Sequence, residues 1–163
     1  MATNSWNQGI WQWSQKSNLF SIFYFMWLAE KRVIKQYQDE QLPQFKTELA
    51  SLVWMEVPLE IHWDEFPLEN SESFLMEGLQ DCYFRPVIEG LKPICADSMG
   101  KEALQWVLKL IIIENSTNRP DTDGQTISFE NGTLRIDQRL QDFWEAFLED
   151  RKNAVTKAIE SAL

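Results

Sequence analysis

Glu60, His62 and Asp64 form the one group in this chain whose residue types and spacing could do chemistry. A spacing of two along a predicted strand places the three side chains on one face, about 6–7 Å apart at the backbone. Two carboxylates beside an imidazole raise its pKa and can orient it as a base or as a metal ligand. A divalent cation would accept this set, with Glu65 nearby.

The same alternation is also typical of a half-exposed strand without chemistry, because every second residue of such a strand faces water. His62 is the only histidine, so any mechanism that needs a histidine must use it. The chain contains no nucleophile-elbow sequence, and Asp81 beside Cys82 disfavours a reactive thiolate. We therefore expect no enzyme activity, no cofactor and no metal. A small metal-dependent or acid/base enzyme centred on Glu60, His62 and Asp64 is the alternative.

Negative charge is the stronger signal. Between Lys46 and Arg85 the chain has nine acidic residues and no Lys or Arg, in a protein whose net charge is −10. Self-repulsion on this scale opposes compaction, so the acidic surface indicates a need for solubility or a basic partner. The same charge disfavours binding to a nucleic-acid backbone or to an anionic membrane. We favour a non-enzymatic module that binds a basic protein through an acidic surface at residues 56–81, as an inhibitor, immunity-type neutraliser or assembly factor.

Two kinds of side chain make up this predicted interface. Carboxylates would steer a basic partner, and exposed aromatic rings would anchor it. The carboxylates are Glu60, Asp64, Glu65, Glu69, Glu72, Glu77 and Asp81. The aromatic anchors are Trp63 and Phe66, with Tyr83 near them.

Length and composition predict a single globular domain over residues 1–163, with a Trp-rich N-terminal arm at 1–17 packed on it. A structural subunit of a larger assembly and a homo-oligomer are further possibilities. The apolar run at 19–29 is too short for a membrane span and lacks the flanks of a signal peptide, so we expect a cytoplasmic protein with no membrane partner. Cys82 and Cys95 match no zinc or redox spacing, and we expect two reduced thiols.

Hydrophobic patterns predict a helix-rich α+β fold, with four or five helices packed on a small antiparallel sheet. The clearest element is a β-hairpin at 126–136, because Asn131-Gly132 suits a type I′ turn. Its register pairs Phe129 with Leu134 and Ile127 with Ile136. The alternating segment Val57–Trp63 is the available third strand, and Pro58 favours an edge position for it.

Capping residues and helical spacing predict the helices. One helix is expected to begin at Asn18, and two more are expected to cover Gln44–Trp54 and 71–83. A further helix is expected to begin at Asp97 or Ser98, and the last one to follow a cap at Asp137. The stretch 19–29 fits a helix or a buried strand equally well. Pro86 is expected to break the chain after the 71–83 helix. The next helix, which contains Trp106, is expected to be central, and its β-branched end could finish as a strand.

Overall fold

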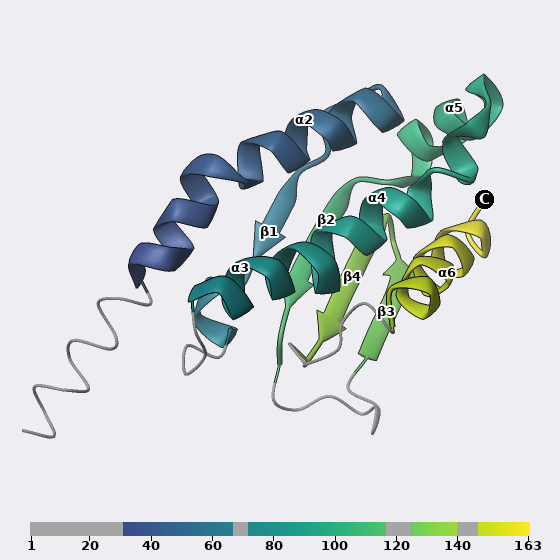
Figure 1. Cartoon of the computed structure of the whole chain (residues 1–163). Helices are drawn as coiled ribbons and strands as arrows, with labels where there is room; N and C mark the ends of the chain where they lie inside the picture. Colours follow the sequence, from purple (N-terminus) through teal and green to yellow (C-terminus); the bar gives the residue numbers. More distant parts are fainter. Residues whose placement is uncertain (1–30, 67–71, 117–124, 140–146) are drawn as a thin grey trace, which may run out of the picture.

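The computed structural model describes residues 31–66, 72–116, 125–139 and 147–163. In this part of the chain, helices cover one face of a four-stranded sheet (Figure 1). The predicted helix-rich α+β fold with its hairpin is confirmed. The predicted N-terminal arm at 1–17 and the ambiguous stretch 19–29 lie outside the described residues.

The strand order is β1-β2-β4-β3, and two of the three pairings are parallel. β1 (Leu59–Ile61) pairs in parallel with β2 (Leu110–Glu114), and β2 pairs in parallel with β4 (Thr133–Gln138). β3 (Gln125–Glu130) is antiparallel to β4. The sheet is therefore mixed, whereas hydrophobic alternation led us to expect an antiparallel one. Alternation does not encode strand direction, and the helical chain between β1 and β2 supplies the long crossover that a parallel pair requires.

β1 is an edge strand, as Pro58 indicated, but it is shorter than the predicted Val57–Trp63 segment. Beyond it, the backbone N–H of His62 still donates to the carbonyl of Ile113 at 3.0 Å. The chain then turns into a single 3-10 turn, η1 (Trp63–Glu65). The side chains after His62 therefore do not follow the two-residue period of a strand.

The predicted hairpin is confirmed in turn and register. Asn131 and Gly132 have φ values of 53° and 84°, both in the left-handed region that a type I′ turn requires. Phe129 lies opposite Leu134, and Ile127 lies opposite Ile136.

Residues 72–91 form consecutive helical elements, whereas we predicted a helix over 71–83 that is followed by a break at Pro86. They are α3 (Glu72–Leu79), a π-helical turn η2 (Gln80–Phe84) and α4 (Arg85–Leu91). The expected break at Pro86 is wrong because this proline stands in the first turn of α4, where its missing N–H interrupts no hydrogen bond. The wide turn before it lets the chain remain helical up to the proline.

Three further helices complete the described layer. α2 (Leu42–Val53) follows a helical segment at residues 31–40 and has a proline in its first turn. α5 (Ser98–Val107) is capped by Asp97, whose carboxylate accepts the backbone N–H of Gly100 at 2.8 Å. α6 (Leu148–Glu160) is the last helix.

Asp137 does not cap the final helix, as we had predicted from its position. It lies in β4, is buried, and accepts the backbone N–H of Ser116 at 2.8 Å. The prediction failed because the pairing of β4 with β3 continues through Asp137 to Gln138, beyond the last hydrophobic residue of the hairpin.

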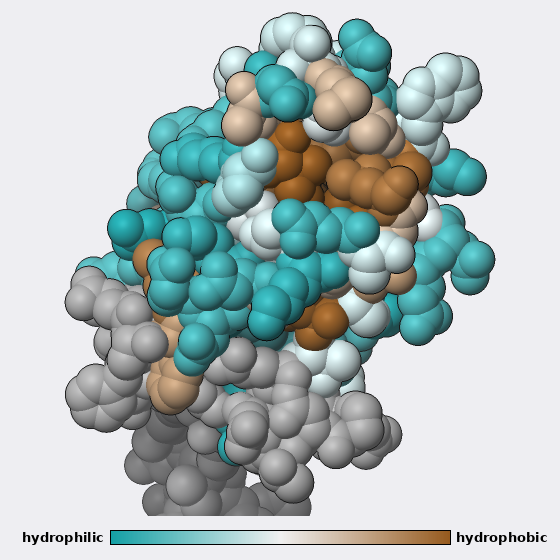
Figure 2. Space-filling view, turned by 90° about the vertical axis from the view of Figure 1, so that its right-hand side faces the viewer, coloured by the Kyte–Doolittle hydropathy of each residue, from teal (hydrophilic) through white to brown (hydrophobic). Residues whose placement is uncertain are grey.

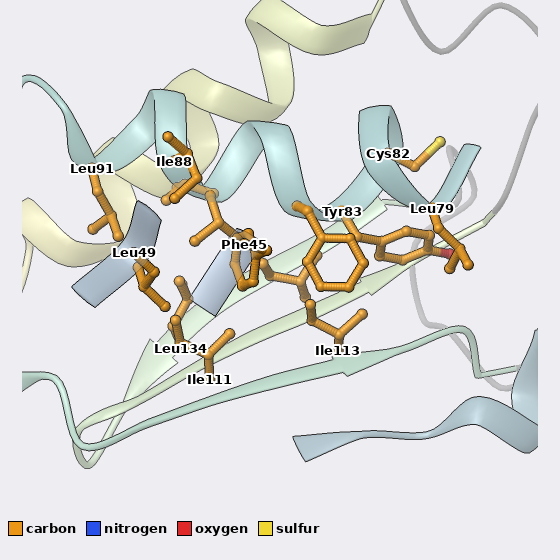
Figure 3. Packing of buried hydrophobic residues seen from close by; sticks show 14 of the residues in the cluster. Phe45, Leu49, Leu79, Cys82, Tyr83, Ile88, Leu91, Ile111, Ile113 and Leu134 are labelled. Carbon is orange, nitrogen blue, oxygen red and sulfur yellow. The ribbon is translucent and has the colours of Figure 1, made fainter. Parts of the chain in front are cut away.

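The hydrophobic core lies between the sheet and the helices. Figure 3 shows Ile111, Ile113 and Leu134 pointing from their strands toward the helices, where Phe45 and Leu49 of α2 lie. All five side chains are buried. Because strand side chains alternate, the neighbours of these strand residues, which include the buried Ile112 as well as Glu114 and Arg135, point to the opposite and more polar face of the sheet.

α5 carries exposed hydrophobic residues, contrary to the expectation that this helix is central. Trp106 is 83% exposed and Met99 is 74% exposed, while the β-branched end does finish as the interior strand β2. Figure 2 shows hydrophobic residues gathered at the upper end of the molecule, where α5 lies in Figure 1. None of the helices within the described residues combines the length and hydropathy of a membrane span.

The close packing of α4 on α6 gives a test of the fold. A Cβ added to Gly90 would lie 2.7 Å from Cβ of Val155 and 2.8 Å from the carbonyl oxygen of Lys152. Because backbone atoms cannot move aside cheaply, we expect Gly90→Ala to lower the free energy of unfolding by about 1–3 kcal/mol in urea denaturation. Asn153→Ala, on the exposed side of α6, serves as the control and should change it by less than about 0.5 kcal/mol. Equal stability of the two variants would contradict the described helix contact.

Candidate metal centre

A polar cluster lies where the parallel strands end. His62 directly follows β1, Glu114 is the last residue of β2, and Glu65 stands in η1 just beyond. In a parallel sheet the carboxyl ends of neighbouring strands meet at one edge, and this edge is where open α/β sheets usually bind ligands. Residues about fifty positions apart in the chain are thereby brought into contact.

Three possible ligand atoms face one another in this cluster. Nδ1 of His62 lies 3.3 Å from Oε1 of Glu65 and 3.5 Å from Oε2 of Glu114. One ligand atom from each of these residues lies within 4.8 Å of the others. In a tetrahedral site with bonds of about 2.0–2.1 Å, neighbouring ligand atoms are about 3.3–3.4 Å apart. The two nitrogen–oxygen distances therefore already match the edges of a metal polyhedron.

The second polar atom of each group is held by an outer partner. Nε2 of His62 lies 2.9 Å from Oε1 of Glu60. Oε1 of Glu114 accepts from Nη1 of Arg135 at 2.6 Å, and Oε2 of Glu65 accepts from the backbone N–H of Asn115 at 3.0 Å. These contacts leave Nδ1 and one oxygen of each carboxylate pointing into the cluster. Such partners orient ligands and strengthen them in known metal sites.

Aromatic packing fixes the short turn that carries Glu65. The ring of Trp63 lies 6.2 Å from that of Tyr37, and the ring of Phe66 lies 5.2 Å from that of Tyr83 in an edge-on contact. Trp63 and Phe66 flank the turn on both sides, so burial of their rings holds η1 against the helices. The side-chain amide of Asn115 adds a hydrogen bond to the carbonyl of Glu65 at 3.2 Å.

The carboxylates raise the pKa of His62. The hydrogen bond to Glu60 raises this pKa most, partial burial opposes it, and Glu65 and Glu114 raise it further. Both ring nitrogens face carboxylate oxygens, an arrangement that favours the protonated imidazole, in which both nitrogens donate. Glu114 is buried, and a buried carboxylate requires such charged partners.

The structure corrects one member of the predicted group Glu60, His62 and Asp64. Glu60 contacts His62, whereas Asp64 is exposed and belongs to no contact of the cluster that the structure describes. The change from strand to 3-10 turn after His62 is the reason, because it rotates Glu65 inward and Asp64 outward. Glu65, noted only as nearby, is the residue that joins the histidine.

Glu114 and Arg135 are the members that the sequence analysis missed. Glu114 does have a local signal, a carboxylate at the end of the buried run Leu110–Ile113. That signal becomes useful only when β2 is known to lie parallel to β1. Arg135 has no comparable local signal, and the pairing of β2 with β4 brings it to Glu114.

The carboxylates of the predicted acidic interface fall into two groups, those with a charged partner and those without one among the described residues. Glu60 and Glu65 contact His62, and Asp81 contacts Arg85 at 3.3 Å. Glu77 and Asp64 are exposed and have no charged partner within the described residues. Glu72 begins α3, and Glu69 lies outside the described residues.

The aromatic part of that prediction also needs correction. Trp63 is partly exposed, but Phe66 is 2% exposed and Tyr83 is fully buried. The expectation that Phe66 and Tyr83 are exposed is wrong because both rings pack into the core beside η1. Cys82 and Cys95 are both buried.

Comparison with known proteins returns no relative. No family model matches the chain, and no curated protein or solved structure is found to be similar to it. A function must therefore be argued from the geometry of the cluster.

The raised pKa of His62 predicts a specific pH dependence. As the only histidine, it should give a single imidazole titration in NMR, with a pKa above 6.5 when a chelator is present. Because this pKa is higher in the folded than in the unfolded chain, the interaction stabilises the fold fully below pH 6.5 and is lost as pH rises through the folded value.

Glu60→Gln should lower the pKa of His62, because Glu60 is the main cause of the shift. Asp64→Asn serves as the control and should leave it nearly unchanged. A pKa of 6.5 or lower in the wild-type protein would contradict the described contacts.

Proposed function

We propose that this protein binds a divalent transition-metal ion through His62, Glu65 and Glu114. The observation that carries the proposal is the orientation of the three groups: one atom of each faces the others, and the remaining polar atom of each is held by an outer partner. One imidazole nitrogen and two carboxylate oxygens suit zinc, manganese, iron or cobalt.

The local charge agrees with a divalent ion. Glu60, Glu65 and Glu114 together with Arg135 carry a net formal charge of −2 around a neutral imidazole. A divalent cation balances this charge when it replaces the proton on Nδ1 of His62. The proton and the metal therefore compete for the same nitrogen, and metal binding must release a proton at a pH below the raised pKa.

Three protein ligands leave further coordination positions open. The side chains of His62 and Glu65 are each 31% exposed, so water or a substrate can reach the metal from that side. An ion with open positions can act as a Lewis acid or lower the pKa of a bound water. The proposed metal centre would therefore also suit a small metal-dependent enzyme, which is the alternative raised by the sequence.

Isothermal titration calorimetry tests the metal site. Wild-type protein freed of metal by chelation should bind one Zn²⁺ or Co²⁺ per chain, with affinity falling about tenfold per pH unit below the pKa of His62. Titrations in buffers of different ionisation enthalpy count the released proton. Glu65→Gln should weaken binding by more than the roughly 10–100-fold typical of a lost outer partner.

Asp64→Asn is the matched control, since it removes a carboxylate from the same turn without touching the cluster. It should bind the metal as the wild-type protein does. Equal weakening by Asp64→Asn and Glu65→Gln would indicate nonspecific attraction of cations to an acidic surface. Absence of one-to-one binding in the wild-type protein would refute the proposal.

The acidic protein-binding surface is a second candidate, now centred on Asp64, Glu77 and Trp63. The observation in its favour is that these two carboxylates are exposed without a charged partner among the described residues, while Trp63 is only partly buried. They remain available to steer and anchor a basic protein. Glu60 and Glu65 would contribute less, because His62 already offsets their charge.

Charge reversal separates this candidate from the metal site. Asp64→Lys with Glu77→Lys should preserve the fold and Zn²⁺ affinity but abolish capture of a basic protein from an extract of the native host at low salt. Wild-type capture should fade as added salt screens the charges. Unchanged capture by the double variant, with the fold verified by circular dichroism, would remove the acidic surface from consideration.

A further inference from the structure

Arg135 determines how many oxygen atoms Glu114 can offer to an ion. Its Nη1 lies 2.6 Å from Oε1 of Glu114, and the carboxylate is buried while the guanidinium is 44% exposed. A charge-assisted hydrogen bond this short is among the stronger contacts in a protein. Oε1 is therefore directed away from the cluster, and Glu114 presents Oε2 alone to His62.

The sheet holds Arg135 in this position. β2 and β4 pair in parallel, with Ile112 opposite Arg135 and Glu114 opposite Asp137. Arg135 thus stands one step diagonally from Glu114 on the polar face. Within the described residues, Glu114 is the hydrogen-bond partner of Arg135, while Asp137 and Glu60 act on its charge from a greater distance.

Glu65 is restricted in the same way. Its Oε2 accepts the backbone N–H of Asn115, which leaves Oε1 for the cluster. The site consequently offers one nitrogen and two single oxygens. Calcium takes six to eight oxygen ligands, commonly including a bidentate carboxylate, whereas zinc and its neighbours accept three protein ligands that include an imidazole.

We propose that Arg135 is a specificity-determining residue of this centre: by occupying one oxygen of Glu114 it selects transition-metal ions over Ca²⁺. The inference rests on the proposed metal site at His62, Glu65 and Glu114. Arg135 acts through Glu114 and does not touch the ion. It is therefore a positioning residue, and its effect is on the ratio of affinities for two ions.

The ratio of Co²⁺ to Ca²⁺ affinity separates positioning from simple charge. Removing a cation from the neighbourhood strengthens the binding of both divalent ions by a similar factor through Coulomb attraction. Freeing Oε1 of Glu114 favours Ca²⁺ more than Co²⁺, because Ca²⁺ takes more oxygen ligands and commonly binds a carboxylate through both oxygens. A change in the ratio therefore reports geometry.

The experiment measures Co²⁺ and Ca²⁺ binding to the full chain by calorimetry, with the visible absorption of bound Co²⁺ as a second readout. Arg135→Met should reduce the preference for Co²⁺ by about tenfold or more and alter the absorption. Arg135→Lys, which keeps the charge and one donor, should retain most of the preference. Arg85→Met removes a guanidinium from a different ion pair and should leave the ratio unchanged.

Each outcome either supports or contradicts the proposed role of Arg135. An unchanged ratio in Arg135→Met, with Co²⁺ still bound, would overturn the role of Arg135 and leave the metal site standing. A wild-type protein that binds neither ion would refute both proposals. Circular dichroism verifies that Arg135→Met folds, and Arg135→Lys tests the same contact if that variant does not.

Discussion

Parallel pairing of β1, β2 and β4 is the constraint on which the candidate centre depends. The aligned isoleucines Ile61, Ile113 and Ile136 set the register by burying one face of the three strands against the helices. In β4, where Leu134 and Ile136 alternate with polar residues, a shift of one residue would turn the apolar pair away from the helices, so the register of this strand is strongly specified. Once the register is set, the ends of the three strands lie side by side, and the polar residues at these ends come together.

The centre shows how a polar cluster can be held rigidly beside a hydrophobic core. Each charged group has two functional atoms, and one of them is used for positioning. Glu114 is the extreme case: it is buried, and the guanidinium of Arg135 offsets the cost of removing its charge from water. What remains is a set of inward-facing atoms whose mutual repulsion a proton on His62 relieves. The proposed metal ion would take the place of that proton.

Local patterns predicted those parts of the fold whose stability is decided within a few residues. The Asn131-Gly132 turn needs two positive φ angles, and its pairing follows from the turn alone. A helix was expected to begin at Asp97 or Ser98, and Asp97 is its cap. Pro86 does not break the helical chain, because it stands in the first turn of α4, directly after the π-helical turn Gln80–Phe84.

The amino-acid sequence by itself determined that His62, the only histidine, has carboxylates on both sides along the chain, and it identified Glu60 correctly as a neighbour. Only the tertiary structure decided that Glu65 and not Asp64 faces the ring, and that Glu114 and Arg135 complete the cluster. The physical reason is the direction of strand pairing. Hydrophobic alternation states which face of a strand is buried, but the partner strand and its direction come from the helices that must fit between β1 and β2.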